Sequence, residues 1–257
     1  MSKRKKLALI LFIGMIVVSS IGFVGCSNNF ISSFSKDVNE YTLSVSVDEV
    51  NHKLSATQSV DYINKTDTNL SNVCFHLYAD SFQKGVSNKP VSVLYENKAY
   101  PNGESFGGIT SLKVSLNGKE ANTEREGTDK TILKVNLAEE LCPRERVKID
   151  FEYVIDLPNI NHRFGYGDNT INLGNFYPVA CVFENGDFNK SEYHYNGDPF
   201  YSDMANYDVT ISHFDNYTLA STGNVVSSET ADHQTTEKIK AFAVRDFAMV
   251  LSSKFQV

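Results

Sequence analysis

The chain has 257 residues, of which 41% are hydrophobic and 21% are charged, a composition typical of a folded globular protein. It lacks the polar, low-complexity composition of a disordered chain. A net charge of −7 excludes the basic footprint that a nucleic-acid-binding domain needs.

The first 25 residues have the pattern of a secretory signal. Four cations at positions 3 to 6 precede an uncharged apolar run from Leu7 to Phe23. The run ends in Val24-Gly25-Cys26, which resembles the lipobox of bacterial lipoproteins, where the cysteine sulfur carries a diacylglycerol. The alternative is an uncleaved anchor, but the 17-residue run is shorter than the roughly 20 residues that span a bilayer.

This interpretation predicts an extracytoplasmic protein, held by lipid on Cys26 at the outer face of a bacterial cell membrane. Residues 26–40 form a polar tether, and residues 41–257 form the folded domain. Without the four cations of the signal, 20 Lys and Arg remain against 31 Asp and Glu, a net charge of about −11. Anionic headgroups do not attract such a domain, so the lipid supplies the attachment.

The other three cysteines, Cys74, Cys142 and Cys181, contain no C-x-x-C spacing, which gives no support to a zinc ribbon or a disulfide framework. Cys74 and Cys181 stand inside apolar runs, where a cysteine behaves as a small buried hydrophobe. One disulfide among the three remains open.

From Tyr41 onward the hydrophobic pattern has period two, which predicts strands with one apolar face. Asn117-Gly118 between two extended stretches predicts a tight hairpin. One short segment, Asn136–Pro143, is helix-like. The predicted fold is therefore all-β, an antiparallel sandwich or saddle of about 12 to 16 strands. The predicted strands are residues 41–50, 53–64, 73–80, 111–121, 131–137, 146–157, 206–214, 217–225, 235–244 and the terminal segment.

The middle of the chain, about Pro158 to Tyr207, is irregular and rich in Phe and Tyr interleaved with Gly. We call it the aromatic segment. Glycine permits tight backbone turns, and aromatic rings cover a surface with few rotatable bonds. A long segment of this kind is usually functional or packs against another body.

No local pattern supports catalysis. The chain has no G-x-S-x-G, no P-loop, no G-x-G-x-x-G and no H-E-x-x-H. His76 alternates with apolar residues and is expected to be structural. A cation site is the less favoured alternative for five residues of the aromatic segment, whose carboxylates are more often loop caps: His162, Asp168, Glu192, His194 and Asp198.

Five segments form a combined pattern: FHLYADSFQ, RFGYGDNTINLGNFYP, GDPFYSDMANYDVTI, GNVVS and VRDFAMVLSSKF. Together they resemble the N-terminal β domain of the zinc aminopeptidase family, which includes aminopeptidase N and leukotriene hydrolase. Its bacterial lipoprotein-type members are the most similar. The family pattern is occupied, with a longer insertion between its halves, by Tyr177, Pro178, Asp198, Pro199, Ala205, Tyr207, Val209 and Ile211.

The resemblance covers about Tyr41 to Val257 and implies an accessory domain that packs on a thermolysin-like catalytic domain. In the family, H-E-x-x-H and a downstream Glu of that second domain hold zinc. We therefore expect no catalytic or metal-binding residue in this chain, no cofactor of its own and no peptide hydrolysis by it alone. Its expected partners are the catalytic domain, from the same gene or a separate chain, and the peptide substrate of the assembled enzyme.

The chain ends about where that catalytic domain is expected to begin, so we expect the aromatic segment and the final strand, Ala241 to Val257, to face it. The family's β domain often contributes a Gln/Glu pair to substrate binding. Here Asp168 or Asn169 occupies that region and is the candidate contact for the substrate's free ammonium group. Turn capping is the more common role for both residues.

Two functions follow. The first is the accessory domain of a surface zinc metallo-aminopeptidase that removes N-terminal residues from peptides. The alternative is a stand-alone surface lipoprotein that binds a peptide, a glycan or a protein through its aromatic residues.

Overall fold

The computed structural model describes residues 37–256. All described residues except Asp37 belong to one compact unit that begins at Val38. The predicted signal sequence and Cys26 lie outside the described residues. Within residues 37–256, no helix has the length and apolar character needed to cross a bilayer.

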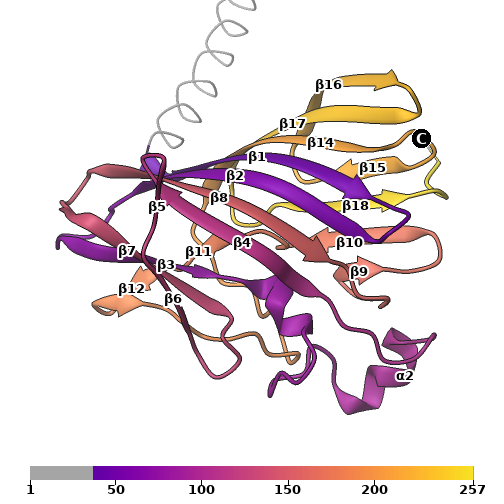
Figure 1. Ribbon diagram of the computed structural model, residues 1–257, viewed down its shortest axis with the longest axis horizontal. Helices are drawn as coiled ribbons and strands as arrows, with labels where there is room; N and C mark the ends of the chain where they lie inside the picture. Colours follow the sequence, from indigo (N-terminus) through magenta and orange to yellow (C-terminus); the bar gives the residue numbers. More distant parts are fainter. Residues whose placement is uncertain (1–36, 257) are drawn as a thin grey trace, which may run out of the picture. The chain divides into compact units, whose positions relative to one another are not determined.

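Eight strands form a large sheet in the order β16-β17-β14-β1-β2-β8-β4-β5 (Figure 1). Side chains along β1 and β14 alternate between a buried side and a more exposed side, which gives the sheet an apolar inner face and a polar outer face. The strands are β1 (Asn39–Asp48), β2 (Lys53–Ile63), β4 (Gly108–Leu116), β5 (Lys119–Glu120), β8 (Arg146–Asp156), β14 (Ala205–Phe214), β16 (Asn224–Ala231) and β17 (Gln234–Val244).

Two four-stranded sheets and a small hairpin complete the unit. One sheet consists of β15 (Thr218–Ser221), β18 (Ala248–Ser252), β10 (Thr170–Gly174) and β9 (Phe164–Tyr166), in that order. The other consists of β11 (Val179–Ala180), β3 (Leu70–His76), β7 (Ile132–Leu141) and β6 (Thr123–Glu126). The hairpin pairs β12 (Phe183–Glu184) with β13 (Asp187–Phe188).

The small sheets share one core with the inner face of the large sheet. Phe75 of β3 meets Phe151 of β8 edge to face, with ring centroids 4.9 Å apart. Tyr207 of β14 stacks on Phe247, just before β18, at 5.3 Å. Since one hydrophobic cluster contains residues of all three sheets, the predicted all-β, sandwich-like class is confirmed.

The predicted hairpin at Asn117-Gly118 is also confirmed. It joins β4 to β5, and Leu116 pairs directly with Lys119. Asn117 and Gly118 have φ of 51° and 75°, the positive values that a two-residue turn of this type requires.

Two features depart from the prediction. β1 pairs with β14 in parallel, so the large sheet is mixed in direction. The described residues contain 18 strands, more than predicted, because the aromatic segment itself forms short strands from β9 to β13.

The prediction of a helix at Asn136–Pro143 is wrong. Most of this segment is the second half of β7, where Asn136 pairs with Asn72 and Leu141 pairs with Leu70 across an irregularity. Pairing with β3 outweighs the helical propensity of the Ala-Glu-Glu-Leu run. The short helices lie elsewhere: η2 (Tyr78–Phe82), η3 (Val93–Tyr95) and α2 (Glu96–Ala99).

The aromatic segment and the final strand do not form the open face that we expected. β18 has β15 on one side and β10 on the other, and Met249 and Leu251 are fully buried. Most large rings of the aromatic segment point into the core, whereas Tyr195 and Tyr201 remain exposed. The reason is that the glycine-rich backbone folds into short strands whose rings fill the space between the sheets. The buried rings are Phe164, Phe176, Tyr177, Phe188, Tyr193 and Tyr207.

Candidate functional site

Three segments of the family pattern meet in a buried aromatic cluster. Tyr41 and Tyr207 pair directly on the parallel strands β1 and β14, and their rings stack with centroids 4.9 Å apart. Tyr177 packs edge-on against both rings at 5.8 Å. Phe247, from the VRDFAMV segment, stacks on Tyr207. Residues far apart in the sequence pattern therefore form one packed unit.

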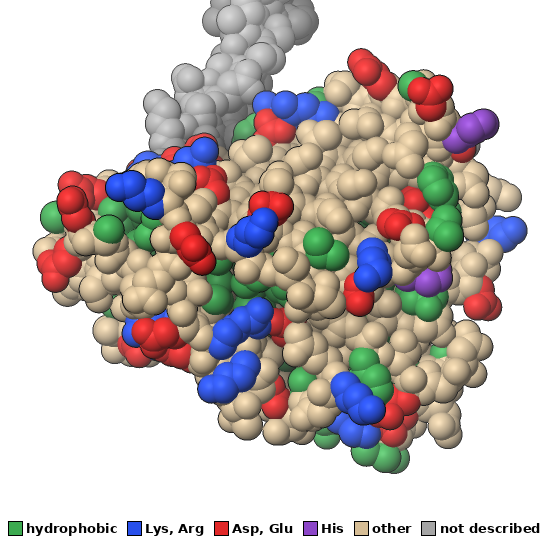
Figure 2. All heavy atoms as spheres, in the orientation of Figure 1, with side chains coloured by type: hydrophobic (Ala, Val, Ile, Leu, Met, Phe, Trp, Pro, Cys, Tyr) green, Lys and Arg blue, Asp and Glu red, His purple; other side chains and the backbone are tan. Residues whose placement is uncertain are grey.

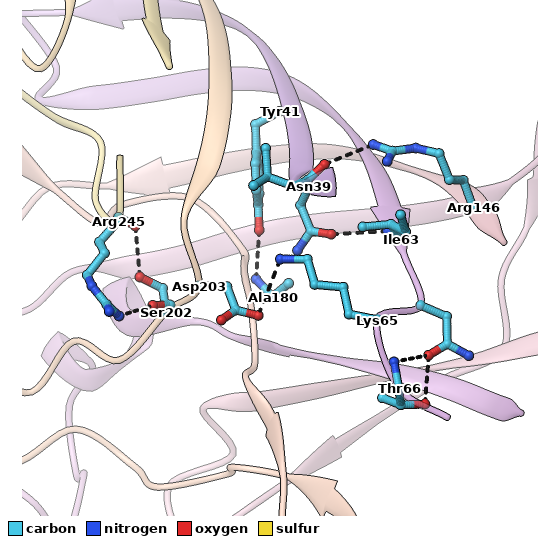
Figure 3. A network of polar contacts seen from close by, with 12 residues as sticks. Asn39, Tyr41, Ile63, Lys65, Thr66, Arg146, Ala180, Ser202, Asp203 and Arg245 are labelled. Atoms are coloured by element: carbon cyan, nitrogen blue, oxygen red, sulfur yellow. Dashed lines mark hydrogen bonds and ion pairs between the residues drawn. The ribbon is translucent and has the colours of Figure 1, made fainter. Parts of the chain in front are cut away.

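The hydroxyl groups of this cluster all have partners. The Tyr177 hydroxyl donates to the Tyr207 hydroxyl at 3.0 Å and accepts from the Phe247 backbone N–H at 3.3 Å. The Tyr41 hydroxyl accepts from the backbone N–H of Ala180 at 3.0 Å (Figure 3). Burial raises the pKa of all three tyrosines well above its ordinary value, so each hydroxyl stays neutral. The cluster holds the sheets together and supplies no ionised base.

Pro178, the next residue of the pattern, is tied to the large sheet. Its carbonyl oxygen accepts a hydrogen bond from Nε2 of Gln58 at 2.8 Å, and Oε1 of Gln58 accepts from the Tyr153 hydroxyl at 3.1 Å. Gln58 is buried on β2, so these bonds satisfy polar groups that water does not reach. Tyr177 and Pro178 thus have a structural role, because they connect the aromatic segment to the large sheet.

The second half of the pattern begins at the surface. Asp198 is exposed and forms a long ion pair of 3.5 Å with Arg163. Its carboxylate also accepts from the backbone N–H of Phe200 at 3.3 Å, a local turn that Pro199 spans. The Arg163 guanidinium lies over the Phe200 ring at 5.1 Å. Asp198 therefore shapes a loop and lies outside the buried cluster.

That loop is attached to the C-terminal strands by a small polar network (Figure 3). The Ser202 hydroxyl donates to the carbonyl oxygen of Arg245 at 2.8 Å, and the Arg245 guanidinium donates to the carbonyl oxygen of Ser202 at 3.0 Å. Asp203 makes a 3.8 Å ion pair with Lys65. The network fixes the start of β14.

Asp168 and Asn169 lie at the exposed tip of the β9–β10 hairpin. The turn closes through a hydrogen bond from the backbone N–H of Gly167 to the carbonyl oxygen of Thr170 at 2.9 Å. Neither the Asp168 nor the Asn169 side chain bonds to another residue within the described part of the chain. Both are therefore available to solvent or to a bound molecule.

The alternative cation site of the aromatic segment does not form. Glu192 accepts from the backbone N–H groups of Thr128 and Asp129 at 2.8 and 2.9 Å, and His194 stacks on Tyr195. Across residues 37–256, no three His, Cys, Asp or Glu side chains gather into a set able to hold a metal ion. The residues present there do not fit a zinc site.

His76 is a buried histidine of the core, as predicted, with its ring stacked on Tyr78 at 4.8 Å. Burial lowers its pKa to about 4, and a backbone hydrogen bond with Asn189 only partly opposes this. Its Nε2 has no hydrogen-bond partner among the described residues. The imidazole is neutral at physiological pH.

None of the three described cysteines forms a disulfide, and Cys74 and Cys181 are buried as predicted. These two lie on neighbouring strand segments, where the backbone N–H of Cys181 donates to the carbonyl oxygen of Cys74 at 2.9 Å. Burial raises the pKa of Cys74 to about 12. Cys142 is exposed, and the nearby carboxylate of Glu145 raises its pKa.

The FHLYADSFQ segment contains a buried ion pair that sequence reasoning missed. Asp80 is buried, and one of its carboxylate oxygens bonds to the guanidinium of Arg125. The other oxygen accepts from the backbone N–H of Ile109 at 2.7 Å. The pair joins η2 to β4 and β6.

Two cavities were also missed, because each is assembled from distant segments. The first, of about 670 Å³, lies on the outer face of the large sheet and includes Thr42, Thr57 and Ser115. Figure 2 shows this face, where acidic and basic side chains are interspersed. The second, of about 500 Å³, lies beside α2 and includes Tyr95, His162 and Tyr195.

No protein-family model matches the chain, and no curated protein matches it significantly. Among solved structures, it is similar to an M1 zinc metallopeptidase from Deinococcus radiodurans, with 12% identity and a TM-score of 0.48. A two-domain M1 zinc metallopeptidase mutant bound to L-arginine gives the same values. Each comparison covers 84% of this chain but 42% of the solved chain, so this chain spans less than half of their length.

Proposed function

We propose that residues 41–257 are the accessory β domain of a surface zinc metallo-aminopeptidase that removes N-terminal residues from peptides. One observation carries the proposal. Tyr177, Tyr207 and Phe247, from three separate segments of the family pattern, meet in one hydrogen-bonded cluster. The three segments thus form one contiguous structural unit. Short segments that match the family pattern by chance would not be expected to meet in this way.

In this proposal the catalytic partner is a thermolysin-like domain, encoded by the same gene or a separate one. That partner provides the zinc, for which the described part of this chain has no ligand set. Part of the exposed apolar surface lies on β16, an edge strand exposed along its whole length. Val225 and Val226, each about half exposed, would contact the partner there.

The assembled enzyme would use the β9–β10 hairpin for substrate. Asp168 carries a carboxylate and Asn169 an amide, and both can bind a peptide's free ammonium group. Their exposed position at the tip, with no competing side-chain bond among the described residues, supports this role. Within residues 37–256, neither side chain makes the hydrogen bond that the predicted turn-capping role would require.

The proposal includes lipid attachment at Cys26, followed by a tether that holds the domain outside the cell membrane. It rests on the sequence of residues 1–40. Incorporation of labelled palmitate should be lost in Cys26→Ser, and the variant should leave the membrane fraction. Labelling retained in that variant would exclude Cys26 as the acceptor.

The direct test is hydrolysis of alanyl-p-nitroanilide with added zinc. We expect no hydrolysis by the 257-residue chain, and zinc-dependent hydrolysis when a thermolysin-like domain from the same genome is supplied. Val226→Glu should weaken that assembly and leave the fold intact. Thr57→Val, a substitution on the outer face of the large sheet, should leave both the assembly and the fold unchanged. Zinc-dependent hydrolysis by the isolated chain would overturn the accessory role, as would indifference of the catalytic domain to its presence.

A specific observation favours the second candidate, a stand-alone binding lipoprotein. The final strand is paired on both sides and most rings of the aromatic segment are buried, so the unit has its own closed core. A stand-alone module should be monomeric and soluble without the lipidated segment. An accessory domain separated from its partner should associate through β16, and sedimentation velocity of residues 37–257 distinguishes the two.

A further inference from the structure

The aminopeptidase proposal does not use the cavity beside α2. The residues that line this cavity are of the kinds found in ligand-binding sites. Its walls come from three segments: residues 90–99, residues 161–162 and residues 195–196. Tyr95 and Tyr195 are 63% and 47% exposed, high values for such large rings. We call this cavity the tyrosine cleft. A volume of about 500 Å³ is within the range of small-molecule sites.

The walls of the tyrosine cleft are held in place. The backbone N–H of Asn161 donates to the carbonyl oxygen of Ala99 at 2.8 Å, which ties the second segment to α2. The Tyr195 ring stacks on His194 at 4.6 Å, and the Asn196 N–H donates to Nδ1 of His194 at 3.1 Å. Bracing of this kind lowers the entropy cost of binding.

The polar groups of the cleft have unused bonding capacity. The imidazole of His162 lines the cleft and is neutral at physiological pH, because burial lowers its pKa to about 4. A neutral imidazole offers one donor and one acceptor. Lys98 is exposed on α2, and within residues 37–256 no carboxylate pairs with it. Its neighbour Glu96 is already paired with Lys89 at 2.9 Å.

These features select among ligand classes. Two exposed rings suit a flat ligand with an apolar face, while imidazole and amide groups suit neutral hydroxyls. One unpaired ammonium group suits a single carboxylate. Capture of a peptide by strand addition needs an open strand edge, and the cleft is walled by short helices and loops. A sugar ring, with apolar C–H faces and a rim of hydroxyls, matches all of these groups.

We propose that the tyrosine cleft binds an acidic saccharide. Tyr95 and Tyr195 stack on the ring faces of the sugar, His162 and Asn161 bond to its hydroxyls, and Lys98 pairs with its carboxylate. This site would let a surface protein attach to an acidic glycan, whether or not the chain joins a peptidase. The inference is thus independent of the aminopeptidase proposal.

The test is an NMR titration of residues 37–257 with two probes at millimolar concentration, tetragalacturonate and the disaccharide of N-acetylglucosamine and N-acetylmuramic acid. We expect shifts confined to the cleft with at least one of them. Tyr95→Ala and Tyr195→Ala should each weaken binding about tenfold, the loss of one stacking contact. Tyr201→Ala, an exposed aromatic outside the cleft, is the matched control and should bind normally.

Charge recognition is tested with the methyl ester of tetragalacturonate and with Lys98→Met. The ester should bind the native cleft more weakly than the acid, and Lys98→Met should remove that difference. Absence of cleft shifts with both probes would overturn the proposal, as would unchanged binding in both tyrosine variants. Preferential binding of the peptide Glu-Tyr-Glu would assign the cleft to peptides and equally overturn it.

Discussion

Gln58 and Pro178 are 120 residues apart in the sequence, yet the Gln58 side-chain amide donates to the Pro178 carbonyl oxygen at 2.8 Å inside the core. The other end of the same amide accepts from the buried Tyr153 hydroxyl. One side chain therefore satisfies polar groups on β8 and on the segment that begins β11.

Replacing this amide with a hydrocarbon should be costly. Gln58→Leu leaves the Pro178 carbonyl and the Tyr153 hydroxyl unsatisfied, and we expect a loss of about 3 kcal/mol in unfolding free energy. Urea denaturation measures the loss. Thr57→Val changes the preceding, outward-facing residue of β2 and should cost less than about 0.5 kcal/mol. Equal effects of the two substitutions would show that the bridge is unimportant.

The buried carboxylate of Asp80 depends on Arg125. Arg125→Met leaves a buried charge without its partner, which should destabilise the protein by about 3–5 kcal/mol. Adding Asp80→Asn should recover much of that loss, since the neutral amide needs no counter-charge. Lys113→Met, which breaks an exposed pair with Glu152, should cost less than about 1 kcal/mol in the same assay. A double variant as unstable as Arg125→Met would contradict the pairing.

Protonation of His76 should contribute to a fall in stability in mild acid. Burial lowers its pKa to about 4 in the folded state, whereas an unfolded histidine titrates near 6.5. Between these values the unfolded chain binds the proton and the folded chain does not, so unfolding is favoured as the pH falls. The loss due to His76 begins near pH 6.5 and levels off near pH 4, at about 3 kcal/mol, and His162, whose pKa burial also lowers to about 4, adds a separate loss in the same range. Thermal melts of the native chain and of His76→Gln measure it, and an equally steep pH dependence in the variant would refute the assignment.

The three described thiols should differ widely in reactivity. Cys142 is exposed and should react with Ellman's reagent in the native protein, slowed by the carboxylate of Glu145. Cys74 and Cys181 should react only after unfolding, because both are buried and burial raises their pKa values. In a protein of residues 37–257, which lacks Cys26, Cys142→Ser should abolish the native-state reaction. Fast labelling that persists in this variant would show that the strands around Cys74 open readily.

The strands were predictable because burial alternates along them. β1 and β8 each place every second side chain in the core, and the hydrophobic pattern of the sequence records this directly. The Asn117-Gly118 turn was predictable because few residue pairs adopt two positive φ angles.

Other features depend on contacts that the sequence pattern does not contain. Asn136–Leu141 has good helix formers, but its partner on β3 makes it a strand. The rings of the aromatic segment look the same in sequence whether they fill a core or face a partner, and Tyr177 and Tyr195 have opposite outcomes. The tyrosine cleft combines Tyr95 with Tyr195, residues that only the tertiary fold brings together.

The parallel pairing of β1 with β14 determines when the molecule can fold. β1 ends at Asp48 and β14 begins at Ala205, so the two parts of the large sheet cannot join until β14 has been synthesised. Pairings of such long sequence separation close late and slowly. Strands β1, β2, β8 and β4 can pair with one another before then, but one edge of β1 stays unpaired until β14 is available, so completion of the large sheet should be a late event.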